Sequence, residues 1–418
     1  MQIHLPYGVT TIPMEIEPCR VITSKIGEMK ASGCGRELVA QAMKNPIGSP
    51  RLQELAKGKK NAVIIISDHT RPVPSRDIIP LMLKELRQGN PEIDITLLVA
   101  TGCHRGTTVQ ELEQKLGSEI IRNEKIVVHD AFDAQSNVEI GILPSGAHLV
   151  IDKLAVEAEL LVAEGFIEPH FFAGFSGGRK SVLPGICDKV TVLGNHCGAF
   201  IDDPLARTGI LEGNPIHRDM EAGAQMGKLQ YIVNVVIDEN KKTVAAFAGD
   251  FRQAHAAGVE FLRQYCEVPP IPGDIVVTTN GGAPLDQNLY QCVKGLTTAE
   301  ATAKPGAAII LCAAMADGIG GDQFYQDMRD CETPAQLYAK FAVTPQDKTV
   351  QDQWQTQILC RVMMKHRVIF VTRPEMRAVI EEMKMEYAPD LQTALAMAGE
   401  GEITAIPDGI SVCICEKQ

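Results

Sequence analysis

The chain has 418 residues, too many for one ordinary hydrophobic core, because single cores stop growing near about 250 to 300 residues. A hydrophobic fraction of 45% and a charged fraction of 22% are typical of a folded soluble protein and exclude a disordered chain. The net charge of −12 disfavours nucleic-acid binding. The first residues lack the features of a secretory signal, and the longest apolar run (307–316) is too short for a membrane. We therefore expect a two-domain cytoplasmic protein without membrane contact.

Short runs rich in β-branched residues predict strands at 61–67, 95–102, 124–130, 159–165 and 231–238. Helical patterns, with apolar residues at i, i+3 and i+4, lie between some of these runs, at 80–88 and 108–116. This alternation is typical of a parallel α/β sheet, and the continuous apolar strands predict that both faces of the sheet are covered.

The segment VPPIPG (268–273) interrupts the pattern, since its three prolines forbid a continuing helix or central strand. We expect a domain boundary or hinge there. Beyond it, strands are predicted at 274–282, 307–314, 367–373 and 410–415. The expected fold is α/β, with two α/β domains and mostly parallel sheets around an interdomain cleft. The N-terminal domain would cover 1–270 and the C-terminal domain 271–418.

Polar residues follow the first two predicted strands, where ligands of open α/β sheets bind. Asp68, His69, Thr70 and Arg71 come after the first strand, and Arg71 could bind a carboxylate or phosphate. His104 follows the second strand in a glycine-framed loop, where it could act as a general base. The residues leave two alternatives open: an ion pair between Arg71 and Asp68 in a solvent loop, and a histidine that only hydrogen-bonds within its loop.

The segment EPHFFAGFSGGRKS (168–181) combines glycines with cationic side chains. Arg179 stands where a Walker phosphate loop requires glycine, which argues against an NTPase. Gly177 and Gly178 permit close approach of a ligand to the backbone. Lys180 can become an amine nucleophile if it is desolvated.

Three later features could belong to a site. His196 offers an imidazole for a metal, but no local spacing names that metal. Gln291 and Lys294 are three residues apart, so on a helix they share a face and could bind one anionic group; a polar face toward water is the alternative. Trp354, the single tryptophan, is either a packed ring or a lid over a site.

The twelve cysteines are scattered along the chain. The close pairs, Cys413/Cys415 and Cys187/Cys197, lack the C-x-x-C spacing of zinc and dithiol sites. We expect reduced thiols with structural roles.

In their order along the chain, these segments resemble the nickel-pincer lactate racemase family of 2-hydroxyacid racemases and epimerases. The resemblance covers nearly the whole chain and rests on DHTRP (68–72), TGCHRG (101–106), EPHFFAGFSGGRKSVLPG (168–185), GNH (194–196), YQCVKG (290–295) and the segment around Trp354. It implies an isomerase with two α/β domains around a cleft.

The resemblance also implies a role for each matching residue. The cofactor would be a nickel pyridinium-3,5-bisthiocarboxylate mononucleotide, tethered covalently to Lys180, with His196 as the protein ligand of the metal. His104 and His170 would be the two catalytic bases. The implied cofactor contacts also include Asp68, His69, Thr70, Arg71, Gly177 and Gly178, and the implied substrate contacts are Arg71, Gln291, Lys294 and Trp354. Cofactor-biosynthesis enzymes would be partners.

Hydride chemistry suits these residues. Removing hydride from a 2-hydroxyacid avoids a costly carbanion and gives a planar 2-keto acid, which can take hydride back on its other face. The two enantiomers present the hydroxyl on different sides, so two histidines would be needed.

Several alternatives remain. The substrate could be malate, 2-hydroxyglutarate, a longer aliphatic hydroxyacid or an aldonate epimerised at C2, and an inward-pointing Arg105, Arg179 or Arg207 would favour a dicarboxylate. A zinc hydrolase built on His104, His170 and His196 lacks a local ligand pair such as HExxH. A nonenzymatic nucleotide-binding or cofactor-carrier protein would not need two bases.

Overall fold

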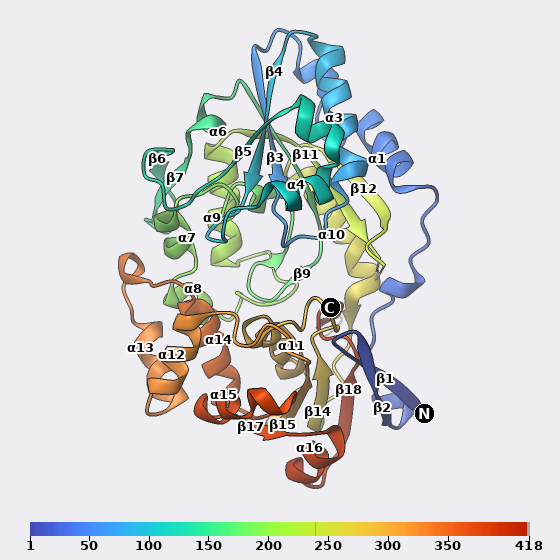
Figure 1. Cartoon of the computed structure of the whole chain (residues 1–418), viewed down its shortest axis with the longest axis vertical. Coiled ribbons are helices and arrows are strands. Elements are labelled where there is room, and N and C mark those ends of the chain that lie inside the picture. Colours follow the sequence, from blue (N-terminus) through green and yellow to red (C-terminus); the bar gives the residue numbers. More distant parts are fainter. Residues whose placement is uncertain (239, 416–418) are drawn as a thin grey trace. The chain divides into compact units, whose positions relative to one another are not determined.

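The computed structural model describes residues 1–238 and 240–415, and the chain forms two compact units (Figure 1). Unit 1 comprises Met1–Lys25, His196–Gly209 and the chain from Cys266 onward, and unit 2 comprises Ile26–Asn195 and Ile210–Tyr265. The chain passes for the last time between the units just before the proline-rich segment in which we expected a boundary. The expected cleft concerns the relative placement of the units and stays a prediction.

Unit 2 is built on a six-stranded sheet with the strand order β12-β11-β8-β3-β4-β5. All neighbours in this sheet are parallel except β11 and β12, which form an antiparallel edge. The strands are β3 (Asn61–Ser67), β4 (Asp94–Ala100), β5 (Lys125–Val128), β8 (Leu160–Phe166), β11 (Leu229–Ile237) and β12 (Thr243–Gly249).

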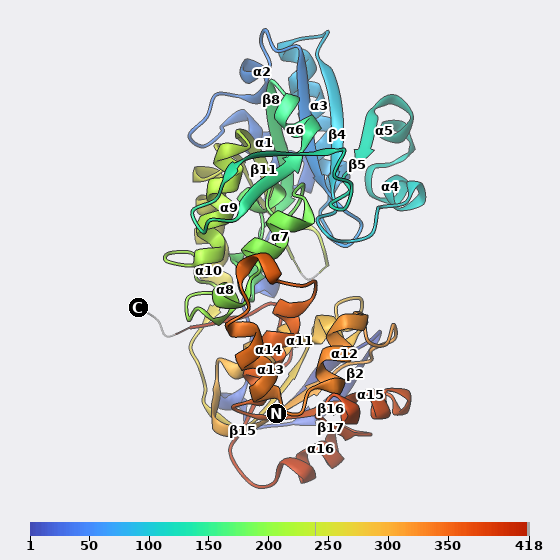
Figure 2. The same cartoon turned by 90° about the vertical axis from the view of Figure 1, so that its left-hand side faces the viewer.

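Helices cover this sheet on both sides (Figure 2). They are α1 (Gly35–Lys44), α2 (Leu52–Leu55), α3 (Ser75–Gly89), α4 (Val109–Leu116), α5 (Ser118–Asn123), α6 (Lys153–Glu157), α7 (Lys189–Asn195), α9 (Pro215–Met226) and α10 (Gln253–Cys266). Ile64 and Ile66 of β3 join one core with the apolar stripe of α3, while Val63 and Ile65 are buried toward the opposite face. The prediction of a parallel sheet buried on both faces is therefore confirmed for unit 2.

Short elements complete unit 2. They are the hairpin β6 (Asn137–Ile142) and β7 (His148–Asp152), the hairpin β9 (Pro169–His170) and β10 (Gly174–Phe175), and the 3-10 turns η2 (Ile26–Glu28) and η3 (Gly178–Ser181). The hairpin of β9 and β10 together with η3 contains the glycine-rich segment.

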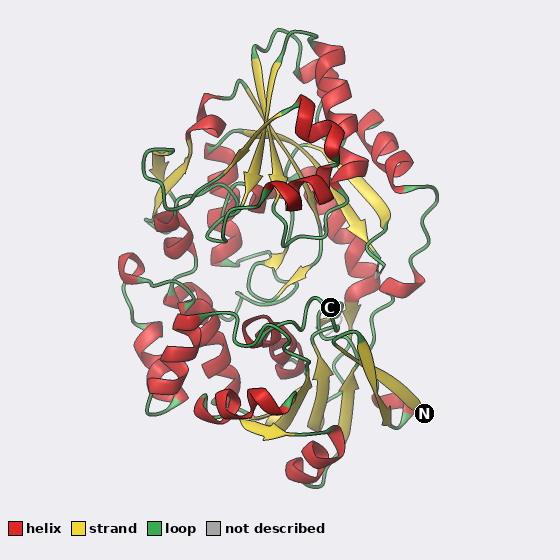
Figure 3. Ribbon diagram, viewed as in Figure 1, coloured by secondary structure: helices red, strands yellow, loops and turns green. Residues whose placement is uncertain are grey.

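Unit 1 holds a second, five-stranded parallel sheet with the order β17-β16-β15-β14-β18 (Figure 3). Its strands are β14 (Gly273–Thr279), β15 (Ala303–Cys312), β16 (Arg367–Val371), β17 (Glu386–Ala388) and β18 (Ile403–Ile406). Its helices are α8 (Gly198–Asp202), α11 (Leu289–Glu300), α12 (Asp322–Asp330), α13 (Pro334–Ala342), α14 (Gln353–Met363), α15 (Arg377–Glu382) and α16 (Leu391–Ala398), with 3-10 turns η1 (Pro18–Arg20), η4 (Gln346–Lys348) and η5 (Pro374–Met376).

Two small strand pairs flank that sheet. The hairpin β1 (Gln2–Tyr7) and β2 (Thr10–Glu15) contributes Ile3, Leu5 and Met14 to the core of unit 1, which explains why the first residues belong there and not with the residues that follow them. The parallel pair β13 (Glu267–Val268) and β19 (Cys413–Ile414) joins the start of the C-terminal segment to its end. Within the described part of the chain, no helix has the length and apolar character that crossing a membrane would require.

Candidate active site

Asp68 and His104 meet at the carboxyl ends of the adjacent parallel strands β3 and β4. Nδ1 of His104 lies 2.7 Å from Oδ2 of Asp68, and the Thr70 hydroxyl donates to Oδ1 at 2.7 Å. Burial alone would raise the pKa of Asp68, but His104, Arg71 and Thr70 together lower it to about 2. The ionised carboxylate accepts the Nδ1 proton, so the neutral ring carries its lone pair on Nε2.

The neighbouring residues hold this loop in place. His69 Nδ1 lies 3.1 Å from the Thr107 hydroxyl, and burial lowers the pKa of His69. Lys115 donates to the carbonyl of Arg71 at 3.1 Å. Asp68 takes its hydrogen bonds from His104 and Thr70, so the simple loop pair of Asp68 with Arg71 is not the arrangement found.

His170 and Lys180 approach the same aromatic ring. His170 lies edge-on to Phe172, with the ring centroids 4.5 Å apart, and Nζ of Lys180 is 5.8 Å from the centroid of Phe172. The Ala173 amide donates to Nδ1 of His170 at 3.2 Å, which places the proton of a neutral ring on Nε2. The two histidines therefore differ in their neutral forms: His170 presents Nε2–H, and His104 presents a lone pair on Nε2.

The glycines before Lys180 are required by the packing of the protein itself. A Cβ atom on Gly177 would lie 2.7 Å from Oδ1 of Asn234, and one on Gly178 would lie 2.8 Å from the ring of His255. Both glycines have positive φ, 83° and 55°. Close internal packing thus accounts for these two residues, and their predicted contact with a cofactor stays a prediction.

Arg179 is a buried anchor that the sequence did not reveal. Its guanidinium donates to Nδ1 of His217 at 2.9 Å and to the carbonyls of Ala173 at 2.8 Å and Gly177 at 3.2 Å, and lies 3.1 Å from Nε2 of His255. Burial lowers the pKa of Arg179 to about 9. Burial and the charge of Arg179 lower the pKa of His217 to about 3, so this histidine stays neutral and can accept the hydrogen bond. These contacts fix the turn that carries Lys180.

His196 and Trp354 pack together in unit 1. His196 is buried just before α8, and its ring meets Trp354 edge-on at 5.1 Å. Gln357 of α14 donates to the carbonyl of Gly198 at 2.9 Å, which ties α8 to α14. Trp354 is 9% exposed, which supports the packed ring over the lid.

Gln291 and Lys294 lie on α11, so they are three residues apart on one helix, and both residues are half-buried. The side chain of Asn288 caps this helix and accepts from the Gln291 amide at 3.0 Å. Cys292 between them is buried, and burial raises the pKa of its thiol well above the ordinary value. It is a core thiol, as expected of most cysteines here.

The side chains of His196 and Lys180 suit the nickel-containing cofactor that the family resemblance implied. A buried imidazole, His196, is a ligand that Ni(II) accepts. Lys180 is half-buried with its amine beside an aromatic ring, and a lysine amine is a group that can form a covalent tether.

The fold and the polar groups at its strand ends define a class of protein with two α/β units. Unit 2 carries His104 bonded to Asp68, and it also carries His170 and Lys180 beside one aromatic ring. The family follows from comparisons. A model of the lactate racemase N-terminal domain matches residues 7–209, and a model of the lactate racemase C-terminal domain matches 268–414. The chain belongs to the lactate racemase family.

Individual relatives agree. The lactate racemase of Thermoanaerobacterium thermosaccharolyticum is 49% identical over 423 residues, and that of Lactiplantibacillus plantarum is 48% identical over 420 residues, with 99% of each chain covered in both cases. The solved structure of the lactate racemase apoprotein from T. thermosaccharolyticum superimposes with a TM-score of 0.96 over the full length of both chains at 48% identity. A Thermotoga maritima protein of 18% identity shares the fold alone, with a TM-score of 0.67 over 90% of this chain and 96% of the other.

Proposed function

We propose that this protein is an isomerase that interconverts the D and L enantiomers of lactate by removing and returning hydride. The observation that carries the proposal is the pair of His104 and Asp68, because an ionised carboxylate holding Nδ1–H prepares Nε2 as a proton acceptor. Family membership supports the reaction type.

The proposed cofactor is a nickel-pincer nucleotide, which when bound would supply a hydride acceptor that neither histidine can provide. Lys180 would hold it covalently and His196 would ligate the nickel. Asp68, His69, Thr70, Arg71, Gly177 and Gly178 would contact it. Cofactor-biosynthesis enzymes would be partners of this chain, and a cytoplasmic location stays a prediction from the sequence.

His104 would take the hydroxyl proton of one enantiomer at Nε2 as hydride leaves the α-carbon. The resulting 2-keto acid is planar, so hydride returned to the opposite face gives the other enantiomer. His170 would serve the hydroxyl on that side: its protonated ring would give a proton to that oxygen as hydride returns, and the proton held by His104 would pass to solvent. Because the neutral ring of His170 has the proton on Nε2, it must move that proton before it can accept one there, so we expect its half-reaction to be the slower one.

The substrate's carboxylate would be bound by Arg71, Gln291 and Lys294, beside Trp354. The three arginines that could have favoured a dicarboxylate are bound to protein groups. Arg105 pairs with Glu111, Arg179 is buried among its four neighbours, and Arg207 donates to the carbonyls of Asp203 and Ala206, both at 2.8 Å. This favours a small monocarboxylate such as lactate over malate or 2-hydroxyglutarate.

The test uses His104→Ala and His170→Ala in single turnovers with each pure enantiomer of lactate. Each variant is expected to lose net racemisation by about 100-fold or more, while retaining keto-acid formation from the one enantiomer that the remaining histidine serves. His148→Ala, at an exposed histidine of unit 2, is the control and should behave as wild type. Full racemase activity in either catalytic-site variant would overturn the two-base proposal.

A further inference from the structure

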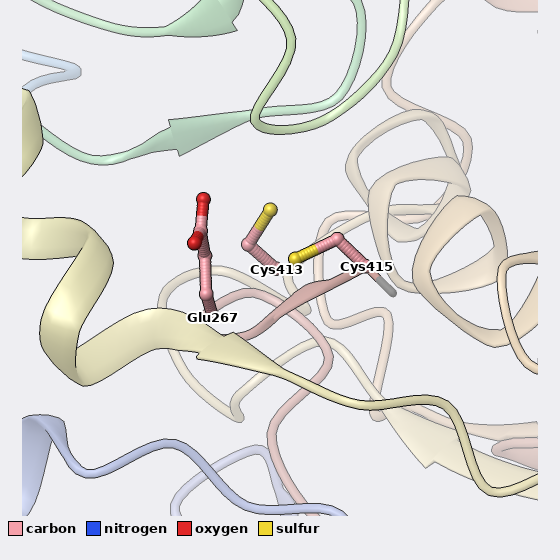
Figure 4. A group of neighbouring side chains, drawn as sticks. All are labelled: Glu267, Cys413 and Cys415. Atoms are coloured by element: carbon pink, nitrogen blue, oxygen red, sulfur yellow. The ribbon is translucent and has the colours of Figure 1, made fainter. Parts of the chain in front are cut away.

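The strongest feature outside the proposed active site is a group of three potential metal ligands in unit 1: Glu267, Cys413 and Cys415 (Figure 4). Their ligand atoms, one carboxylate oxygen and two sulfurs, all lie within 4.8 Å of one another. Both cysteines are thiols and not a disulfide. We propose that these three side chains bind a thiophilic divalent cation of the zinc class, separate from the nickel proposed at His196.

The backbone brings the three ligands to one face. Glu267 on β13 is the register partner of Cys413 on β19, so their side chains leave the parallel pair on the same side. Cys415 is two residues beyond Cys413, which returns its side chain to that face, and its amide donates to the carbonyl of Val268 at 3.0 Å. Figure 4 shows the three side chains converging from the two strands. Sequence spacing could not predict this, since the carboxylate comes from a distant segment.

The chemistry of the group selects the ion. Two thiolates and one carboxylate supply three ligands of a four-coordinate site, and water can complete it. Zn–S bonds of about 2.3 Å in a tetrahedral site place sulfurs roughly 3.8 Å apart, so small side-chain rotations bring the ligands to bonding distance. Binding would release the two thiol protons to solvent, with no change in the oxidation state of metal or sulfur.

The packing around Cys413 indicates a prepared position. Cys413 is 1% exposed, and a Cβ atom on Gly209 would lie 2.3 Å from its sulfur, so glycine at that position leaves room for the sulfur. Cys415 and Glu267 are half-buried, which leaves a side from which an ion can enter. The parallel pair of β13 and β19 has only two pairs of residues and is marginally stable by itself, so a bound ion would stabilise it. Gly209 ends the segment that begins at His196, so the ion would also stabilise that segment.

The test titrates Co²⁺, as a spectroscopic substitute for Zn²⁺, into the full-length, chelator-treated protein produced without nickel cofactor. We expect one equivalent of Co²⁺ to give thiolate charge-transfer absorption that Zn²⁺ abolishes. Cys415→Ser and Glu267→Gln should weaken Zn²⁺ binding, the former by roughly 100-fold or more. Cys34→Ser, at an exposed cysteine, is the matched control and should retain the absorption.

His196→Ala separates this site from the proposed nickel ligand and should also retain the absorption. The proposal is overturned if wild type gives no thiolate absorption, if Cys415→Ser binds as tightly as wild type, or if His196→Ala alone removes the signal. It is also overturned if protein purified without oxygen is two hydrogen masses light because Cys413 and Cys415 have formed a disulfide.

Discussion

At the scale of single residues, the structure separates groups prepared for chemistry from groups that support them. His104 is 46% exposed at its side chain yet held by a buried carboxylate, an arrangement that orients a base while leaving it accessible. Arg179, in contrast, is a buried cation whose hydrogen bonds go to groups of the protein itself. Both occur in loops that the sequence marked as functional, so position alone does not distinguish the two roles.

Asp68→Asn is expected to lower kcat by about 100-fold or more, because an amide does not hold His104 in the form with a lone pair on Nε2. Steady-state racemisation of lactate measures this. Asp152→Asn is the matched control, since Asp152 forms the buried pair with His129 in the same unit, at 3.0 Å. That variant should lose stability and keep its kcat when folded. If Asp68→Asn had the kcat of the wild type, the hydrogen bond between Asp68 and His104 would only stabilise the loop.

The neutral state of His217 predicts a pH dependence of stability. Its folded pKa of about 3 lies below the unfolded value of 6.5, so its stabilising contribution is present above pH 6.5 and is lost as the pH falls toward 3. Lowering the pH from 7 to 5 should therefore reduce the free energy of unfolding by about 1 to 2 kcal/mol through His217.

His217→Gln should flatten that part of the profile, measured by urea unfolding followed by circular dichroism. His148→Gln, at an exposed site, should leave the slope unchanged. An identical slope in His217→Gln and wild type would contradict the assignment.

The sequence places Asp68 and His104 at strand ends, but it predicts neither their hydrogen bond to each other nor the anchor formed by Arg179. Asp68 and His104 follow two strands that are parallel neighbours, and this geometry brings their side chains together. Arg179 looked like a ligand-binding cation, because nothing in its local sequence indicates the buried His217 and His255. Glu267 and Cys413 likewise meet only through the tertiary pairing of two very short strands.

At the scale of elements, continuous apolar runs predicted the central strands correctly, since buried parallel strands carry such runs on both faces. The helix expected at 80–88 begins earlier, at Ser75, with Pro80 inside it, because the apolar stripe from Ile78 to Leu86 outweighs one lost hydrogen bond. The strand expected at 410–415 is reduced to β19, and the strand beside β14 is the four-residue β18, too short to stand out in the sequence.

Helix α11 gives a test at this scale. Asn288→Ala removes its N-cap and should cost about 1 kcal/mol, fraying the turn that carries Gln291. If Gln291 and Lys294 bind the substrate's carboxylate, KM for lactate should rise severalfold with a smaller change in kcat. Thr333→Ala removes the equivalent cap of α13, which holds no predicted site residue, and should leave KM unchanged. Equal KM values in both variants would remove α11 from the substrate site.

At the scale of the whole molecule, the chain passes several times between the two units, so a single boundary along the sequence cannot divide them. Met1–Lys25 and His196–Gly209 pack into unit 1, although the expected N-terminal domain covered 1–270. Apolar residues of the first hairpin and the contacts of α8 with α14 provide the physical reason. As a result, the proposed nickel ligand belongs to one unit and the proposed tether, Lys180, to the other. Covalent loading at Lys180 and metal retention at His196 can therefore be measured as separate properties.

The most direct test of the proposed racemase activity is chiral analysis of lactate after incubation with protein that the cofactor-biosynthesis enzymes have loaded in the presence of nickel. Starting from pure L-lactate, and separately from pure D-lactate, we expect convergence to equal amounts of both enantiomers with only traces of pyruvate. Lys180→Ala, prepared in the same way, should leave each enantiomer unchanged. Loaded wild-type protein that racemises another 2-hydroxyacid but not lactate, or that converts lactate to pyruvate without forming the opposite enantiomer, would contradict the proposed activity.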